Sequence, residues 1–322
     1  MRKAFIIYNP LSGRARRDGP QQISKVLAIF RAAGVEAESC VTTHAGSAII
    51  QTEEAVSAGC DAVIACGGDG TANEILNGLM HSNADVALGV LPFGSGNLLA
   101  NDLLLPANVE AAAHLLLAYK PRLLHPGLML YQDNGSQQHR YFMIAGSAGL
   151  SADLMYRTFT KTKGRYGIYA YFLEMLRMGL RPRFPMFNAE WKDEQGQHQS
   201  AEVTMVSGVR VSRFPGLLKC VQLGGELVRN DYRLLLFRTD RLRDLINYFA
   251  SVGSGVNWGV WEIESVYSTW FRCTPLALQE PTSIRFEADG EVLGALPVEV
   301  SIDSRTFKLL MPVSASDDRG PV

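Results

Sequence analysis

The sequence predicts an α/β fold in two parts, an N-terminal doubly wound domain and a C-terminal, mainly antiparallel β domain. Three observations predict it. Short apolar runs alternate with amphipathic helix patterns as far as about residue 120. Strand patterns dominate from about Arg122 onward. Glycine-rich loops directly follow strands of the first part, and open α/β sheets bind their ligands beyond the carboxyl ends of their strands.

The first part has a βαβαβαβ order. Its strand runs are almost wholly apolar, which is typical of parallel strands covered by helices on both faces. We expect strands at KAFIIYN (3–9), VEAESCVT (35–42), DAVIACG (61–67) and VALGVLP (86–92), and helices at QQISKVLAIFRAAG (21–34), AGSAIIQTEEAVSAG (45–59) and TANEILNGLM (71–80).

The second part contains strand patterns that suit antiparallel sheets, with helix patterns only near 151–180 and 242–252. The strand runs are RYFMIAGSAG (140–149), AEVTMVSGVRV (201–211), YRLLLFRTD (232–240), TSIRFEADGEV (282–292) and LPVEVSID (296–303). Two prolines, Pro121 and Pro126, mark the change of pattern. We expect domains at 1–124 and 125–305, with the tail of about 306–322 packing back on the first domain and its end, SASDDRGPV, frayed.

Composition excludes several classes of protein. The formal charge of -1 and pI near 6.6 give no general basic field, so we expect no nucleic-acid partner. The five cysteines are scattered, without CxxC pairs, as in a reducing cytoplasm. The N-terminus has too short an apolar run for a signal peptide, and no apolar stretch approaches the roughly 20 residues that cross a bilayer. We expect a cytoplasmic protein whose membrane contact is peripheral; a homodimer is left open.

The loop GGDG, after the strand at 61–67, is the first candidate site. Glycine amides at the start of a helix suit a phosphate group, although a tight turn would use the same glycines. Asp69 would repel a phosphate unless Mg²⁺ bridges the two, and Mg²⁺ sites often combine one or two carboxylates with phosphate oxygens. Glu74, one helical turn later, is expected to be a second magnesium ligand or to cap the start of the same helix.

Two more loops follow strands at the same predicted edge. NPLSG (9–13) precedes three arginines, and PFGSGN (92–97) contributes Ser95 and Asn97 as donors or N-caps. The chain contains neither GxxxxGK[ST] nor GxGxxG. Three loops at successive strand ends predict one phosphate-binding crevice.

In this order and spacing, NPLSG, GGDGTANE with the following NGL, PFGSGN and DGE (289–291) resemble the diacylglycerol kinase catalytic family, which includes sphingosine, ceramide and bacterial lipid kinases. The resemblance runs from Asn9 to about Pro312. It implies a first domain similar to NAD kinases and phosphofructokinases, a second, β-sandwich domain that receives a lipid, and ATP between them.

The resemblance also implies site residues. Nucleotide contacts carry over onto Asn9, Ser12, Thr42, Gly67, Gly68, Asp69, Gly70, Thr71, Gly94, Ser95, Gly96 and Asn97. Thr42 has an alternative interpretation as a helix N-cap. Asp289 and Glu291 match a late acidic pair, one a candidate general base and the other a metal or nucleotide contact; without the other motifs, DGE would be interpreted as a hairpin turn. Whether Asp69 or Asp289 takes the proton is left open.

The segment 157–183 holds seven Lys or Arg and a single acid, Glu174, interleaved with aromatic residues. A basic, aromatic-rich helix suits anionic lipid head groups, although a solvated face of a packed helix is nearly as good an interpretation. By resemblance, GLSADL and GRYG place a substrate-side acid at Asp153 and a phosphate-binding arginine at Arg165; Asp153 could equally be a helix-start acid.

These observations predict an ATP- and Mg²⁺-dependent lipid kinase acting on a diacylglycerol-like or sphingolipid-like hydroxyl at the inner face of the membrane. The alternatives are a NAD kinase-like phosphotransferase with a soluble substrate and a non-catalytic regulator that binds nucleotide or lipid. The acceptor itself depends on the shape of an apolar pocket, which composition does not give.

Overall fold

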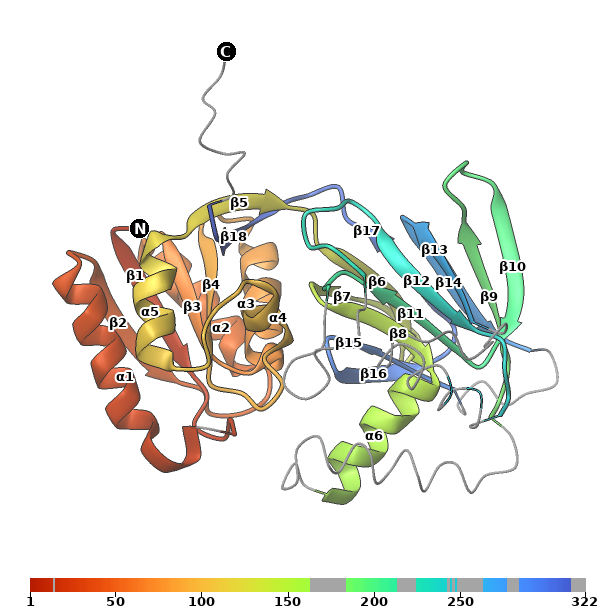
Figure 1. Cartoon of the computed structure of the whole chain (residues 1–322), viewed down its shortest axis with the longest axis horizontal. Helices are drawn as coiled ribbons and strands as arrows, with labels where there is room; N and C mark the ends of the chain where they lie inside the picture. Colours follow the sequence, from red (N-terminus) through yellow and green to blue (C-terminus); the bar gives the residue numbers. More distant parts are fainter. Residues whose placement is uncertain are drawn as a thin grey trace, which may run out of the picture. The chain divides into compact units, whose positions relative to one another are not determined.

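The computed structural model describes residues 1–13, 15–162, 184–212, 224–241, 244, 247, 263–276 and 284–313. The chain forms two compact units (Figure 1). One comprises residues 1–125 together with 305–322, and the other comprises residues 126–304.

The first unit is built on a parallel sheet. Strands β1 (Lys3–Tyr8), β2 (Glu36–Val41), β3 (Ala62–Gly67) and β4 (Ala87–Pro92) pair in parallel in the order β2-β1-β3-β4. The intervening helices are α1 (Ala15–Ala32), α2 (Ser47–Ser57) and α3 (Asp69–Ser82), followed by α4 (Leu98–Asp102) and α5 (Val109–Ala118). Every residue of β3 and β4 is buried, because α1 packs beside α5 and α2 beside α3 to cover the sheet. The predicted doubly wound α/β fold is confirmed.

The sheet of the first unit also includes the end of the described chain. Strand β18 (Phe307–Met311) runs parallel to β4 and antiparallel to β5 (Lys120–Leu124), so the full order is β2-β1-β3-β4-β18-β5. The buried side chains of Phe307, Leu309 and Leu310 anchor β18 in this sheet. The first unit therefore needs both ends of the chain.

Over its described residues, the second unit is a sandwich of two six-stranded antiparallel sheets, and this predicted class is confirmed. One sheet has the order β10-β9-β14-β17-β6-β7, formed by β6 (Gly127–Asp133), β7 (Ser136–Phe142), β9 (Phe187–Lys192), β10 (His198–Val203), β14 (Trp270–Pro275) and β17 (Val298–Ile302). The other has the order β13-β12-β11-β8-β15-β16, formed by β8 (Ala145–Gly149), β11 (Met205–Val209), β12 (Tyr232–Phe237), β13 (Ile263–Ser268), β15 (Arg285–Ala288) and β16 (Glu291–Ala295).

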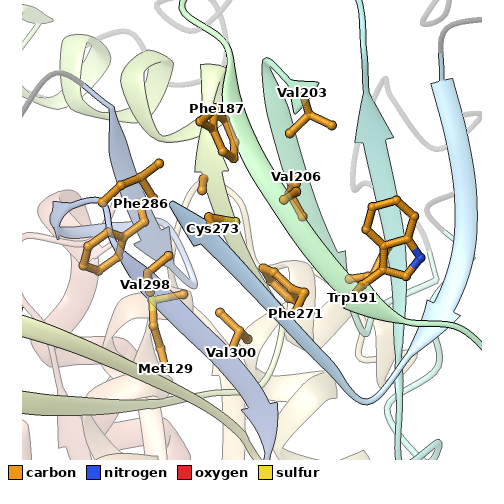
Figure 2. Packing of buried hydrophobic residues seen from close by; sticks show 14 of the residues in the cluster. Met129, Phe187, Trp191, Val203, Val206, Phe271, Cys273, Phe286, Val298 and Val300 are labelled. Carbon is orange, nitrogen blue, oxygen red and sulfur yellow. The ribbon is translucent and has the colours of Figure 1, made fainter. Parts of the chain in front are cut away.

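The core of the second unit lies between these two sheets. Figure 2 shows Phe187, Phe271 and Val300 of one sheet among Val206 and Phe286 of the other. All five side chains are nearly inaccessible to solvent. Burial of aromatic and β-branched side chains from both inner faces is the main stabilisation of such a sandwich.

Two runs that the sequence presents as continuous each supply strands to both sheets. RYFMIAGSAG divides into β7 and β8, with the break at Met143 and Ile144. AEVTMVSGVRV divides into β10 and β11 at Thr204, whose hydroxyl donates to the carbonyl of Thr239 at 2.7 Å. Alternation alone does not reveal these breaks, because the residues at the break are as buried as those in the strands.

Helix α6 (Leu150–Thr162) follows β8 and packs on β8, β15 and β16. It is the described part of the predicted helical region at 151–180. Most of the basic segment 157–183, most of the predicted helix at 242–252 and the tail SASDDRGPV lie outside the described residues. Within the described part of the chain, no helix is long and apolar enough to cross a membrane.

Candidate active site

The loops after β1, β3 and β4 meet at one edge of the sheet in the first unit. The loop after β4 joins the loop after β3 through a hydrogen bond from Gly94 N–H to the carbonyl of Gly67 at 3.0 Å. The loop after β1 joins them because Gly13 lies against Ser95: a β-carbon on Gly13 would come within 2.4 Å of the Ser95 hydroxyl oxygen. The predicted convergence of NPLSG, GGDG and PFGSGN is therefore present in the structure.

Glycine is required where two of these loops cross. A β-carbon on Gly94 would lie 2.5 Å from the α-carbon of Gly68, which is backbone and cannot move aside. Gly70 differs, because a β-carbon there would meet nothing within 4 Å. Packing of the loops explains Gly94, whereas Gly70 leaves open space beside the backbone, as a ligand that approaches closely requires.

Asp69 is the first residue of α3 and connects two loops. Its Oδ2 accepts the N–H of Leu98 and its Oδ1 accepts the N–H of Leu99, both at 3.1 Å. The carboxylate therefore caps the start of α4. Gly96 is close to the same group, since a β-carbon there would lie 3.3 Å from Oδ2.

The Asp69 carboxylate is chemically suited to bind magnesium. Carboxylate oxygens accept more than one bond each, so capping α4 does not exclude a cation. No group of three or more His, Cys, Asp or Glu that could hold a metal occurs among the described residues. Such a group is not needed when phosphate oxygens supply the other ligands.

Glu74 takes the second of its two predicted roles, but for a neighbouring helix. Its Oε1 accepts the N–H of Gly46 at 2.9 Å and its Oε2 accepts the N–H of Ala48 at 3.1 Å. These N–H groups belong to the start of α2, which has no side-chain cap of its own. Helix capping accounts for this acid without a metal.

The remaining predicted nucleotide contacts of the first unit lie in and beside these loops. Asn9 follows β1, accepts the N–H of Leu11 at 2.9 Å and approaches the Thr71 hydroxyl at 3.5 Å. The N–H of Ser12 donates to the carbonyl of Asn9 at 3.2 Å. Thr42 follows β2, where its N–H donates to the carbonyl of Tyr8 at 2.8 Å.

One helix-cap interpretation was wrong, and a second is correct for the backbone position alone. Thr42 is not the N-cap of α2, because that position belongs to Gly46. Asn97 occupies the N-cap position of α4 but makes no side-chain cap bond there. Its amide nitrogen instead donates to the carbonyl of Gly94 at 2.7 Å, so it stabilises the glycine loop from within.

In the second unit, Asp289 forms a hairpin turn and binds the neighbouring strand at the same time. Asp289 and Gly290 have φ angles of 48° and 86° between β15 and β16. Oδ1 of Asp289 accepts the N–H groups of Ile144 at 2.7 Å and Ala145 at 3.0 Å, and Oδ2 accepts that of Met143 at 2.9 Å. Three donors stabilise this carboxylate as an anion and explain why the chain breaks between β7 and β8 at this point.

The other two predicted acidic site residues of the second unit form ion pairs. Glu291 pairs with Arg140 at 2.5 Å. Asp153, buried on α6, pairs with Arg285 at 2.8 Å. The Arg285 guanidinium also lies 3.9 Å from the centre of the Tyr156 ring. Arg165 lies outside the described residues.

Sequence reasoning missed Glu287 and Arg285. Burial raises the pKa of the Glu287 carboxyl to about 7. Its Oε2 accepts the N–H of Gly290 at 2.8 Å, inside the DGE turn. The signal was an acid between Phe286 and Ala288, two core residues of one strand, because alternation places 285, 287 and 289 on the opposite face.

Known proteins named diacylglycerol kinase are similar to this chain in sequence. Residues 3–127 match the sequence model of the diacylglycerol kinase catalytic domain. A protein of Bacillus subtilis (strain 168) named diacylglycerol kinase is 29% identical over 315 residues, which are 97% of each chain. A diacylglycerol kinase of Staphylococcus aureus (strain JH9) is 31% identical over 179 residues, 55% of this chain and 53% of that protein.

The fold of the whole chain is also shared with a solved structure. A diacylglycerol kinase from Bacillus anthracis strain Sterne superposes with a TM-score of 0.71 at 19% identity, covering 96% of this chain and 97% of that one. Together with the four motifs, these matches make the chain similar to diacylglycerol kinases, with residues 3–127 matching the catalytic domain of that family.

Proposed function

We propose that the protein is an ATP-dependent lipid kinase that transfers the γ-phosphate to a hydroxyl of a diacylglycerol-like or sphingolipid-like acceptor. The observation that carries the proposal is the convergence of the NPLSG, GGDG and PFGSGN loops, held together by Asp69 and by the close approach of Gly94 to Gly68. The family match of residues 3–127 supports a kinase, and the relatives' names support a lipid acceptor.

The first unit supplies groups suited to nucleotide phosphates. The start of α3 has glycine at its N-cap and no side-chain cap bond, which suits an anion at the positive end of the helix dipole. Gly67, Gly68 and Gly70 allow phosphate oxygens to approach the backbone. Asn9 and Thr71 lie beside the same loop and are proposed to orient the nucleotide.

Asp69 is the proposed magnesium contact. When bound, Mg²⁺ neutralises charge on the transferring phosphoryl group, which is a principal requirement of phosphoryl transfer. Asp69 would hold it while capping α4, so the metal contact and the shape of the PFGSGN loop depend on the same carboxylate. Glu74 is omitted from the proposed magnesium contacts because it caps α2.

Asp289 is the proposed carboxylate for the acceptor hydroxyl. General base catalysis needs a carboxylate that is ionised and fixed in orientation. The bonds from the N–H groups of 143–145 meet both conditions. Asp153, paired with Arg285, is proposed to lie on the acceptor side.

Contact with the membrane is proposed to be peripheral and to involve the segment 157–183. The net charge of this segment is +6, from seven Lys or Arg and Glu174. Each cation near an anionic surface contributes on the order of 1 kcal/mol. Flotation with vesicles containing anionic lipid tests this: binding that disappears in vesicles of neutral lipid supports it, and equal binding to both contradicts it.

The proposed activity is tested by offering the chain ATP and a panel of detergent-dispersed acceptors, with and without Mg²⁺. The panel contains diacylglycerol, monoacylglycerol, phosphatidylglycerol, ceramide, sphingosine and NAD, and products are identified by mass spectrometry. A phosphorylated lipid supports the proposal and names the acceptor. Phosphorylated NAD would replace it with a NAD kinase-like activity, and ATP binding without any transfer would favour a regulator.

A further inference from the structure

The DGE turn has a second acid beneath it, Glu287, on the side of β15 that faces away from the sandwich core. Phe286 and Ala288 point into the core, so the side chain of Glu287 points to the face on which α6 packs. Only 6% of Glu287 is exposed, and an acid so deeply buried is retained against a considerable desolvation cost. The hydrogen-bond partners of Glu287 therefore indicate its role.

Glu287 has two kinds of partner. Its Oε2 accepts the N–H of Gly290 at 2.8 Å, which fixes the turn that carries Asp289. It is also hydrogen-bonded to Ser147, the residue opposite it on β8. Ser147 in turn lies 2.8 Å from the hydroxyl of Ser207, opposite it on β11. A polar row thus crosses three neighbouring strands and ends in the turn.

Asp289 and Glu287 attach the same turn to β8 at two separate points. Asp289 binds the N–H groups at 143–145, where β8 begins, while Glu287 binds Ser147 inside the strand. The turn has positive φ at both central residues, and a β-carbon on Gly290 would come within 2.9 Å of the Met155 side chain of α6. The attachment points and the contact with α6 leave the turn little freedom to move.

We propose that Glu287 is a positioning residue for Asp289, holding the Asp289–Gly290 turn in place through Gly290 and the Ser147–Ser207 row. The inference rests on the proposed function in assigning Asp289 to the reaction. Glu287 acts through the turn and does not itself contact the acceptor.

This positioning role depends on whether the Glu287 carboxyl is ionised. The pKa of Glu287 is raised to about 7, chiefly by burial and to a smaller extent by the charge of Asp289, against the opposing effect of the bonds from Gly290 and Ser147. Among the described side chains of the packed elements, Asp153 of α6 pairs with Arg285, with Arg157 nearby, and Glu291 of β16 pairs with Arg140. Ionisation of Glu287 therefore places a second negative charge behind Asp289 and strengthens the bond to Gly290.

The first test follows the amide of Gly290 by ¹H–¹⁵N NMR from pH 5 to pH 9 in the full chain. In the wild type this amide should titrate with a midpoint near 7, and in Glu287→Gln, which keeps the size and an acceptor oxygen, the titration should vanish. Ser147→Ala is the second variant: it removes a donor to the carboxylate, so the midpoint should rise. An unchanged Gly290 titration in Glu287→Gln, or an unchanged midpoint in Ser147→Ala, would overturn the inference.

The second test measures kcat and KM for the phosphorylated lipid across the same pH range. Glu287→Gln should lower kcat about tenfold and remove the inflection in its pH profile, with KM for ATP unchanged. A pH profile of kcat that superposes on the wild type contradicts the positioning role. The amide titration needs no substrate. If the wild type phosphorylates no lipid, the proposed function fails, but the titration still decides whether Glu287 contacts the turn.

Discussion

Asp69 and Leu99 are joined by a hydrogen bond of 3.1 Å from the Leu99 N–H to the Asp69 carboxylate, across thirty positions of sequence. The bond ties the loop after β3 to the loop after β4. A residue expected to contact the nucleotide and a metal therefore also builds the loop that is expected to face the nucleotide. A variant of Asp69 therefore changes both the shape of this loop and the proposed metal contact.

Two glycines of the crossing loops should respond differently to alanine. Gly94→Ala places a β-carbon 2.5 Å from the Gly68 backbone, so the loops must separate. We expect the free energy of unfolding to fall by about 1–3 kcal/mol and ATP binding to be lost. Gly70→Ala meets nothing within 4 Å and lies in the first turn of α3, so it should not lower the Tm. Thermal unfolding and ATP titration of both variants measure this. Equal Tm values for Gly94→Ala and the wild type would refute the packing argument.

Gly70→Ala also tests what the open space is for. If phosphate oxygens approach this backbone, the added methyl group should weaken ATP binding without weakening the fold. Unchanged ATP affinity in Gly70→Ala would mean that the nucleotide does not come close at this position.

Glu74→Gln should separate capping from metal binding. The variant keeps one acceptor oxygen for the start of α2 but replaces the second with an amide donor, so we expect a cost of about 1 kcal/mol by denaturant unfolding. The Mg²⁺ concentration giving half-maximal transfer should stay as in the wild type. A large rise in that concentration would instead return Glu74 to the metal site.

The succession of strands and helices along the first unit, and its loops, could be predicted from sequence because both depend on local patterns. Apolar runs such as DAVIACG have the length and composition of buried strands, and glycine follows them directly. The pairing of β18 between β4 and β5 could not be read in the same way. It joins residues about two hundred positions apart, and no local pattern in Phe307–Met311 distinguishes one sheet from another.

The acids of the second unit show a different limit. The motif DGE drew attention to Asp289 and Glu291, while Glu287 had no motif and was overlooked. Its burial and its bond to Gly290 depend on which side of β15 faces the core, and on the register that sets Ser147 opposite it. The breaks at 143–144 and at Thr204 were missed for the same reason, since they depend on distant partners at Asp289 and Thr239.

Asp289→Asn should cost stability as well as activity. An amide nitrogen in place of one carboxylate oxygen would face an N–H donor at 143–145, leaving a buried donor unsatisfied at a cost of about 1–3 kcal/mol. Glu291→Gln is the matched control, because the Glu291 side chain is half exposed in its pair with Arg140 and should cost less than about 1 kcal/mol. Urea unfolding of both variants gives the comparison, and equal losses would contradict the account of Asp289.

Glu287 should make folding stability depend on pH. Its folded-state pKa of about 7 lies above the ordinary value of 4.5, so its contribution is fully present below pH 4.5 and is lost as pH rises through 7. Relative to Glu287→Gln, the wild type should lose about 3 kcal/mol of unfolding free energy between pH 4 and pH 8. Parallel curves for the two proteins across this range would show that the carboxyl does not titrate as described.

The measurement closest to the central claim is transfer of the ATP γ-phosphate to the lipid panel by the wild type and by Asp69→Asn, each with and without Mg²⁺. Asp69→Asn keeps an acceptor oxygen for the α4 cap but loses the charge that holds the metal. The account predicts a Mg²⁺-dependent phosphorylated lipid from the wild type and at least about a hundredfold less from a folded Asp69→Asn. Lipid phosphorylation by Asp69→Asn at the wild-type rate, or phosphorylation of NAD alone, would contradict it.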